Sequence, residues 1–485
     1  MPPMSETAAP EPLVSVVIPV YNAEKYLRET LDCVCNQTLR NIEIICVDDG
    51  STDSSQDILQ EYAARDPRFR ILHQQNQYAG VARNNGMAAA RGKYLSFLDA
   101  DDLFEPDMLE KMSARAEETG AEMVCCDVDS FTDGARQLRP MSRLVHELAA
   151  RFRDVFRPAT ALGSGLFRAF VPAPWNKLFQ ANYARNTGCP WLDTPYSNDL
   201  TFVLYAVYKC RRMALLDEAP VHYRERVSSI SHSKRRDVSV FFRAWGELRA
   251  RLVQDGAGQE TMQAFDNTFL DHINWFLCSL PLGAREGLLR EYAERYDKTQ
   301  FHLLELPEAH FEDRDKLRKV RGLIMPQLSV VVPFEKDPAA AERILRSSCS
   351  PDYYGYELVY CCPAQDAAYG EMLERCARHC PQLRVFRGTE TDARAFCRAP
   401  RIGVLPRGCK LAPNAGPALD RLCRQAEGTV GLAPLSVRQS RRELFLRYRA
   451  DRKSWCLFGR PFLTVMYSAG NREFWLFGHR VAFFG

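Results

Sequence analysis

The chain lacks any uninterrupted apolar run near the ~18–20 residues that a helix needs to cross a bilayer. It also lacks a charge excess, since 64 Lys and Arg residues face 61 Asp and Glu residues, a net charge of +3. That balance gives no support to a nucleic-acid-binding function, and we expect no nucleic-acid partner. The 17 cysteines lack the paired spacing of a zinc site. We expect them to be buried, reduced thiols of a cytoplasmic protein.

Residues 1–12 have neither the basic start nor the apolar core of a secretory signal, and we expect a short disordered lead. Beyond them, short β-branched segments alternate with helical patterns. The expected strands are 14–19, 42–47, 69–73 and the segment that ends before Asp99, and the expected helices are 23–35, 54–64 and 80–90. This alternation predicts a Rossmann-like, mostly parallel α/β sheet with right-handed crossovers.

A length of 485 residues exceeds one ordinary core, so we expect several domains. A helix (106–119) and a strand (122–128) follow the first sheet pattern, and a helical middle segment precedes a second α/β pattern. The expected parts are the lead (1–12), an α/β domain (13–235), a helical linker or insert (236–325), a second α/β domain (326–435) and an aromatic and basic tail (436–485).

The second α/β pattern reads as a copy of the first. Pro333 follows Pro19 by 314 residues, and the same offset pairs Glu43 with Glu357 and Arg70 with Arg384. We interpret this as an internal duplication at a long period; the alternative is that any two α/β units share such patterning.

The copy is degenerate in its polar residues. Cys362-Pro363 stands where the first unit has Asp48-Asp49, and Pro406-Arg407-Gly408-Cys409 stands where it has Asp99-Ala100-Asp101-Asp102. A site without carboxylates cannot hold a divalent cation by oxygen ligation. We therefore expect a structural or partner-binding second unit.

Polar residues end three strands of the first unit: Pro19-Val20-Tyr21-Asn22, Asp48-Asp49-Gly50-Ser51 and Asp99-Ala100-Asp101-Asp102. Open α/β sheets gather such residues at one ligand-binding edge. An Asp-x-Asp offers hard oxygen ligands to a divalent cation that also holds a diphosphate, although Asp102 could instead cap the next helix. Tyr21 and an aspartate of the second segment suit a planar base, and Arg83 suits a diphosphate.

These three segments and Ala82-Arg83-Asn84-Asn85-Gly86 resemble the family-2 inverting glycosyltransferases, which have the GT-A nucleotide-diphospho-sugar transferase fold. The resemblance covers about residues 13–110, and more weakly extends to 235. It implies nucleotide contacts from Pro19, Tyr21, Asp48, Asp49, Arg83, Asp99 and Ala100, and a Mn²⁺ or Mg²⁺ ion on Asp101 and Asp99. His222 is a candidate third metal ligand or phosphate contact, with a structural histidine as the alternative.

Inverting transfer needs a general base for the acceptor hydroxyl. The matching segment contains Asn198-Asp199, so Asp199 is the candidate, with helix N-capping as its alternative and Asp193 as a weaker base. Trp175, Lys177 and Asn198 are candidates for the acceptor or sugar pocket, while Trp175 could equally be a core residue.

The sequence thus predicts transfer of a sugar from a nucleotide-sugar donor, with UDP-sugar favoured, to a glycan or lipid-linked hydroxyl. The alternative is a catalytically weak or inactive sugar-nucleotide-binding or scaffold protein of a polysaccharide-assembly complex. Nucleotidyl transfer is disfavoured, because no Gly-rich basic loop follows the first strand. The tail suits a peripheral contact with the inner face of a membrane, packing on the second unit, or an oligomer contact.

Overall fold

The computed structural model of the chain divides into two compact units, residues 1–268 and 269–485. It describes residues 11–132, 137–142, 144–226, 237–279 and 291–324, together with shorter segments between 326 and 484 that contain the elements named below. Among these residues, no helix combines the length and the apolar character that crossing a membrane requires.

The first unit is built on a mixed sheet in the order β3-β2-β1-β4-β8-β6-β9-β5, with β7 paired to β6. Its strands are β1 (Val14–Val20), β2 (Ile42–Asp48), β3 (Phe69–His73), β4 (Tyr94–Phe97), β5 (Leu103–Phe104), β6 (Met123–Thr132), β7 (Arg139–Ser142), β8 (Lys177–Gln180) and β9 (Met213–Glu225). Strands β1 to β4 are parallel, and β8 runs against both β4 and β6. The parallel-dominated GT-A arrangement predicted from the sequence is confirmed.

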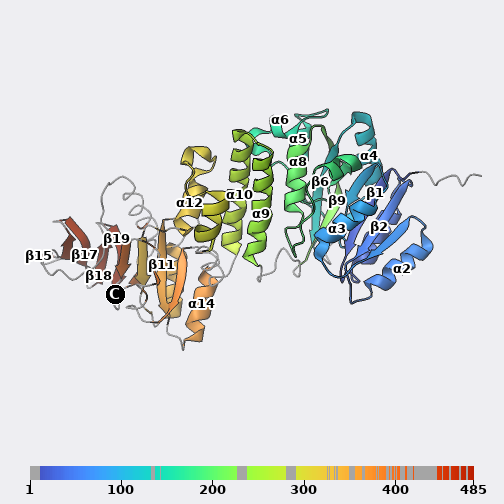
Figure 1. Cartoon of the computed structure of the whole chain (residues 1–485). Coiled ribbons are helices and arrows are strands. Elements are labelled where there is room, and N and C mark those ends of the chain that lie inside the picture. Colours follow the sequence, from blue (N-terminus) through green and yellow to red (C-terminus); the bar gives the residue numbers. More distant parts are fainter. Residues whose placement is uncertain are drawn as a thin grey trace, which may run out of the picture. The chain divides into compact units, whose positions relative to one another are not determined.

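The helices of the first unit bury apolar residues that recur at helical spacing. They are α1 (Leu27–Cys35), α2 (Ser55–Arg65), α3 (Tyr78–Ala89), α4 (Met108–Thr119), α5 (Leu144–Ala149), α6 (Pro158–Ala161), α7 (Ala181–Asn186), α8 (Leu200–Lys209) and α9 (Val238–Gln254). Helix α3 lies against β1 and β2 (Figure 1). Gly86 allows this approach, since a Cβ there would lie 2.3 Å from Cγ1 of Val17.

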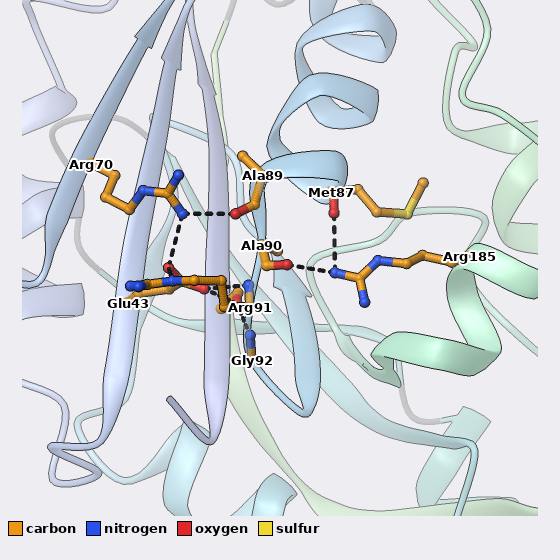
Figure 2. A network of polar contacts seen from close by, with 9 residues as sticks. Glu43, Arg70, Met87, Ala89, Ala90, Arg91, Gly92 and Arg185 are labelled. Atoms are coloured by element: carbon orange, nitrogen blue, oxygen red, sulfur yellow. Dashed lines mark hydrogen bonds and ion pairs between the residues drawn. The ribbon is translucent and has the colours of Figure 1, made fainter. Parts of the chain in front are cut away.

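A buried carboxylate fixes the edge of the sheet where β1 and β2 begin (Figure 2). Glu43 is only 3% exposed and accepts hydrogen bonds from Ser15 Oγ and the Arg91 backbone N–H, both at 2.6 Å, and from Arg70 at 3.2 Å. Burial opposes ionisation, but these donors outweigh it and lower the pKa of Glu43. Ser15 Oγ in turn accepts the Gly92 N–H at 2.8 Å. We call this the Ser15–Glu43–Arg70 network.

The second unit contains a smaller parallel sheet in the order β12-β11-β10-β13, which is the order β3-β2-β1-β4 of the first unit. Its strands are β10 (Leu328–Val332), β11 (Tyr356–Cys362), β12 (Leu383–Arg387) and β13 (Arg401–Val404), and its helices include α13 (Pro338–Ser348) and α14 (Ala367–Ala377). The predicted helical middle segment is confirmed in α9, α10 (Gln259–Ser279), the π-helical η3 (Tyr292–Phe301) and α12 (Arg314–Ile324).

The second sheet also repeats the buried network of the first. Ser329 Oγ donates to Glu357 at 2.6 Å and accepts the Ala399 N–H at 3.0 Å. Arg384 Nη1 donates to Glu357 at 3.1 Å and to the Phe396 carbonyl at 2.7 Å. In the first unit, Arg70 Nη1 likewise donates to the Ala89 carbonyl at 2.7 Å.

The strand registers agree as well. Val14 is paired with Ile42, and Leu328 with Tyr356. The Ser329–Glu357–Arg384 network therefore occupies the same place in the second sheet as the Ser15–Glu43–Arg70 network does in the first.

The end of the chain forms a third sheet that the sequence reasoning did not foresee. Its order is β14-β19-β18-β17-β16-β15, with every described pair antiparallel. The strands are β14 (Lys410–Leu411), β15 (Phe445–Arg449), β16 (Arg452–Leu457), β17 (Arg460–Ser468), β18 (Asn471–Leu476) and β19 (His479–Phe484). Pro363 and Pro406–Cys409 lie outside the described residues. The membrane, packing and oligomer roles of the tail stay predictions.

We predict that Glu43→Gln lowers the free energy of unfolding of the first unit by about 2 to 4 kcal/mol, because it leaves buried donors without their anionic acceptor. Chemical denaturation measures the change. Glu61→Gln is the matched control, since that carboxylate pairs with Arg28 at the surface and should leave the midpoint nearly unchanged. Equal effects of the two substitutions would contradict the structural role of the network.

Candidate active site at the carboxyl edge of the sheet

The loops that follow β1 and β2 are tied to each other. Asn22 has a positive φ of 47°, and its Oδ1 accepts the Thr52 N–H at 2.8 Å, while its own N–H donates to Ser51 Oγ at 3.1 Å. Gly50 also has a positive φ (76°), which glycine adopts without strain. These bonds explain the Asn and Gly of the two sequence segments. Tyr21 lies beside them and is 50% exposed.

The two aspartates at the end of β2 are buried and hold loop backbone. Asp48 Oδ1 accepts the Ser51 N–H at 3.1 Å. Asp49 Oδ1 accepts from Gln74 Nε2 at 2.7 Å and from the Gln77 N–H at 2.8 Å. In the structure both carboxylates therefore order the loops. Their contact with the base of the nucleotide stays a prediction. Pro19, within the buried strand β1, stays a predicted contact in the same way.

Three carboxylates gather where β4 ends, and positive groups offset two of them. Arg83 Nη2 donates to Asp99 Oδ1 at 2.6 Å, and Arg226 forms an ion pair with Asp101. Burial, and then repulsion from Asp99, raise the pKa of Asp101. Ala100 between them is 9% exposed and packs in the apolar core, which leaves little of its side chain for a nucleotide.

Asp102 is not the helix cap that the sequence left open. Helix α4 begins at Met108 with Asp107 at its N-cap position. Asp102 instead accepts the Arg224 N–H of β9 through Oδ1 at 2.9 Å, and its Oδ2 is buried without a hydrogen-bond partner among the described residues. Burial, reinforced by Asp101, raises the pKa of Asp102 well above its ordinary value.

The chemistry of Asp99 and Asp101 fits a divalent cation, because crowded carboxylate oxygens are hard ligands whose repulsion a cation would relieve. His222 does not join them: its Nε2 lies 2.8 Å from Glu105 Oε1. Within the described ranges, no three His, Cys, Asp or Glu side chains are arranged so that together they could hold a metal ion. The third ligand predicted at His222 is therefore not supported, and the remaining ligands would have to come from a diphosphate and water.

Asp199 stands at the N-cap position of α8, yet its side chain makes no capping hydrogen bond. The backbone N–H groups of Asp199 and Leu200 nevertheless lie near enough to lower its pKa, so both its role as a base and its role as a helix cap stay predictions. Burial raises its pKa, Arg83 opposes that rise, and Asp99 adds to it. The weaker candidate Asp193 is exposed and paired with Arg243 at 2.5 Å, so its surroundings do not prepare it as a base.

The residues proposed for the acceptor pocket have different surroundings. Lys177 is 1% exposed and donates to the carbonyls of Val171 and Ala173 and to Asn176 Oδ1, at 2.7, 2.8 and 2.7 Å. With these three acceptors it holds the interior together, which argues against a pocket role. Trp175 is 4% exposed and stacks on Tyr223, so the core alternative holds. Asn198 is the pocket candidate that contacts the site.

Helix α3 positions the Asp199 segment through three residues on one face. Gly80 packs so closely that a Cβ would lie 1.9 Å from the Leu192 carbonyl oxygen. Asn84 both donates to the Trp191 carbonyl at 2.9 Å and accepts the Trp191 N–H at 3.1 Å. Arg83 Nη1 donates to Asn198 Oδ1 at 2.7 Å. We call Gly80, Arg83 and Asn84 the α3 contact face.

Sequence reasoning missed Gly80, Asn84 and Trp191 as site-building residues. The available signal was the spacing of Gly80, Arg83 and Asn84, since positions i, i+3 and i+4 share one face of a helix. Trp191, 2% exposed, carries no such signal; it stacks on Phe202 with ring centroids 4.0 Å apart, and the Arg83 guanidinium lies 5.2 Å from its ring.

Comparisons with known proteins identify relatives of this chain. The family model described as glycosyl transferase family 2 matches residues 15–179. The chain is 33% identical over 264 residues to EpsH of Bacillus subtilis (strain 168), a protein named as a glycosyltransferase; the match covers 53% of this chain and 74% of EpsH.

Two further matches are partial. TuaG of Bacillus subtilis (strain 168), named for teichuronic acid biosynthesis, is 45% identical over 102 residues, which cover 21% of this chain and 40% of TuaG. The crystal structure of Staphylococcus aureus TarS 1-349 in complex with UDP aligns at 18% identity with a TM-score of 0.48, covering 64% of this chain and 85% of that one.

We predict that Gly80→Ala displaces the segment 191–199 and lowers the free energy of unfolding by about 1 to 3 kcal/mol, because the new Cβ would overlap the Leu192 carbonyl. Hydrogen exchange followed by mass spectrometry should show faster exchange in this segment. Gly165→Ala is the control, since no atom lies within 4 Å of the added Cβ. Unchanged exchange in Gly80→Ala would contradict the close packing of α3.

Proposed function

The chain belongs to glycosyl transferase family 2 and is a glycosyltransferase, and we propose that its first unit transfers a sugar, with inversion, from a nucleoside diphosphate sugar to an acceptor hydroxyl. The observation that carries the proposal is the carboxylate of Asp199. It stands at a helix N-terminus without capping it, close enough to Asp99 and Arg83 for their charges to act on its pKa.

In the proposed reaction the acceptor O–H gives its proton to the Asp199 carboxylate as the oxygen attacks the anomeric carbon. The new carbon–oxygen bond forms opposite the bond that breaks to the diphosphate, so the anomeric centre inverts. Partial burial supports this role: it raises the pKa of Asp199 and thereby strengthens the carboxylate as a base.

Asp101 with Asp99 would hold Mn²⁺ or Mg²⁺. When bound, the ion would offset the negative charge that gathers on the leaving diphosphate. Both side chains are partly exposed, at 21% and 31%, so a ligand can reach them. The raised pKa of Asp101 supports the assignment, because a cation would relieve the repulsion that contributes to the shift.

For the nucleotide we propose Tyr21 as the face on which the base lies, since it is half exposed beside the ordered loops after β1 and β2. A UDP-sugar is the first donor to test. A glycan or lipid-linked acceptor agrees with the biosynthetic name of the partial relative TuaG. A catalytically inactive binding or scaffold protein is the second candidate, and the retained carboxylates Asp99, Asp101 and Asp199 argue against it.

We predict that Asp199→Asn lowers kcat by at least about 100-fold, the usual contribution of a general base, while UDP binding with Mn²⁺ stays unchanged by calorimetry. Because the pKa of Asp199 is raised, the wild-type rate should rise with pH through a limb above the ordinary aspartate range. Asp193→Asn is the control and should retain normal turnover. Near-normal turnover in Asp199→Asn would remove it as the base.

The second unit is, in our proposal, a degenerate copy of the first that has kept the fold and not the donor site. The shared strand order and the matching Ser329–Glu357–Arg384 network support duplication. A buried ionic network at the same register is improbable for two unrelated sheets, because each partner must be supplied from a different strand or loop. Its residues Cys362 and Pro363, in place of two aspartates, support the loss of donor binding.

We predict one UDP–Mn²⁺ site per chain by calorimetry, and none in Asp101→Ala, because only the first unit retains the carboxylates that would hold the ion. A second site that persists in Asp101→Ala would show that the copy binds donor. If Asp101→Ala binds as much UDP with Mn²⁺ as the wild type does, the assignment of Asp101 as a metal ligand is wrong.

A further inference from the structure

Arg83 is the residue through which the donor side and the acceptor side of the site meet. Its two terminal nitrogens donate in different directions: Nη2 to Asp99 after β4, and Nη1 to Asn198 in the segment before α8. Asn198 is itself held, since its Nδ2 donates to the Thr194 carbonyl at 3.1 Å. One planar guanidinium therefore bridges the carboxylate cluster and the residue that precedes Asp199.

The guanidinium has a fixed place. Arg83 is 4% exposed, its Cζ lies 5.2 Å from the centroid of the buried Trp191 ring, and its Nε is buried without a hydrogen-bond partner among the described residues. A rigid fork of donors loses little entropy when it binds two acceptors. These bonds differ from the phosphate contact that the sequence predicted, because both terminal nitrogens already hold protein oxygens.

The α3 contact face makes this bridge possible. Gly80 packs against the backbone of Leu192, and Asn84 forms two hydrogen bonds with the backbone of Trp191. Sliding of the helix along the segment 191–198 would break these contacts. Ser197 completes the connection with a positive φ of 52°, which turns the chain immediately before Asn198 and Asp199. The segment that leads to Asp199 is therefore anchored on α3, and Arg83 links the preceding residue, Asn198, to Asp99.

The charges near Asp199 come from three elements. Arg83 on α3 lowers the pKa of Asp199, and Asp99 after β4 raises it. Lys177 on β8 is close enough for Asp199 to raise the ammonium pKa, although burial lowers that pKa overall. Loss of the Arg83 charge should therefore shift the titration of Asp199 to higher pH, whereas loss of Asn198 should leave the charge in place.

We propose that Arg83 is a positioning residue that couples the donor-side carboxylate Asp99 to the proton-accepting Asp199, through its bond to Asn198. The proposal rests on the assignment of Asp199 as the base made above. Its consequence is that Arg83 acts on turnover more than on donor affinity, since it orients a group that accepts a proton only during transfer.

Asn198→Ala tests the bridge without removing a charge. We expect kcat to fall about 10- to 100-fold, the cost of a small misplacement of a catalytic group, with the Kd for UDP and Mn²⁺ within about twofold of wild type, a change below ~0.5 kcal/mol. The acid limb of the kcat profile should stay where it is. Full turnover in Asn198→Ala would overturn the proposal.

Arg83→Met removes both the bridge and the charge, so the acid limb should also move to higher pH. Arg83→Lys keeps the positive charge but can contact only one of the two partners. The acid limb of its kcat profile should stay at the wild-type pH, while kcat falls. If both variants instead weaken UDP–Mn²⁺ binding and leave kcat normal, Arg83 is a phosphate contact and the proposal fails.

Arg185→Met is the matched control, because Arg185 ties the other end of α3 through the Met87 and Ala90 carbonyls (Figure 2). It should lower the unfolding midpoint and leave the kcat profile unchanged. If the acid limb of the kcat profile moves as far in Arg185→Met as in Arg83→Met, then loosening α3 is sufficient to cause the shift. That result would also overturn the proposal. Failure of the base assignment is separate, since it appears as normal turnover in Asp199→Asn.

Discussion

Crowded negative charge at the end of β4 is the constraint that organises the first unit. Asp99, Asp101 and Asp102 lie within four positions, and burial makes the ionised forms of Asp101 and Asp102 costly. Arg83 forms an ion pair with Asp99, Arg226 forms an ion pair with Asp101, and the Arg224 backbone N–H donates to Asp102. These partners come from parts of the chain that are distant from the aspartates in sequence, so the contacts that balance the charge also assemble the site.

At the opposite edge of the sheet one buried carboxylate, and not three, requires hydrogen-bond donors. There Glu43 accepts from Ser15, Arg70 and the Arg91 N–H, and Glu357 accepts from Ser329 and Arg384. The two sheets share this arrangement, while the carboxylates of the β4 end belong to the first alone by sequence. The network at one edge of a sheet therefore does not depend on the residues at the other edge.

Sequence reasoning predicted the sheet of the first unit and its polar edge, because both follow from local periodicity and from residues next to strand ends. It paired Glu43 with Glu357 correctly in register for the same reason. It left helix capping open for Asp102, whereas Asp107 stands at the N-cap position of α4. It proposed a pocket role for Lys177 that three internal acceptors argue against. It did not foresee the strands of the third sheet, since a mixture of arginine and aromatic residues fits a membrane-facing surface as well as a strand.

The sequence by itself determined the fold class, because alternating strand and helix patterns follow from local periodicity. It also determined the position of the acidic cluster and the candidate base, because each lies in a short contiguous segment. Only the tertiary structure decided what those groups do to one another. Arg83 meets Asn198 across 115 positions, and Asp102 meets Arg224 across 122. Such partners are chosen by how helices and strands pack, because a hydrogen bond depends on distance and direction in space and not on separation along the chain.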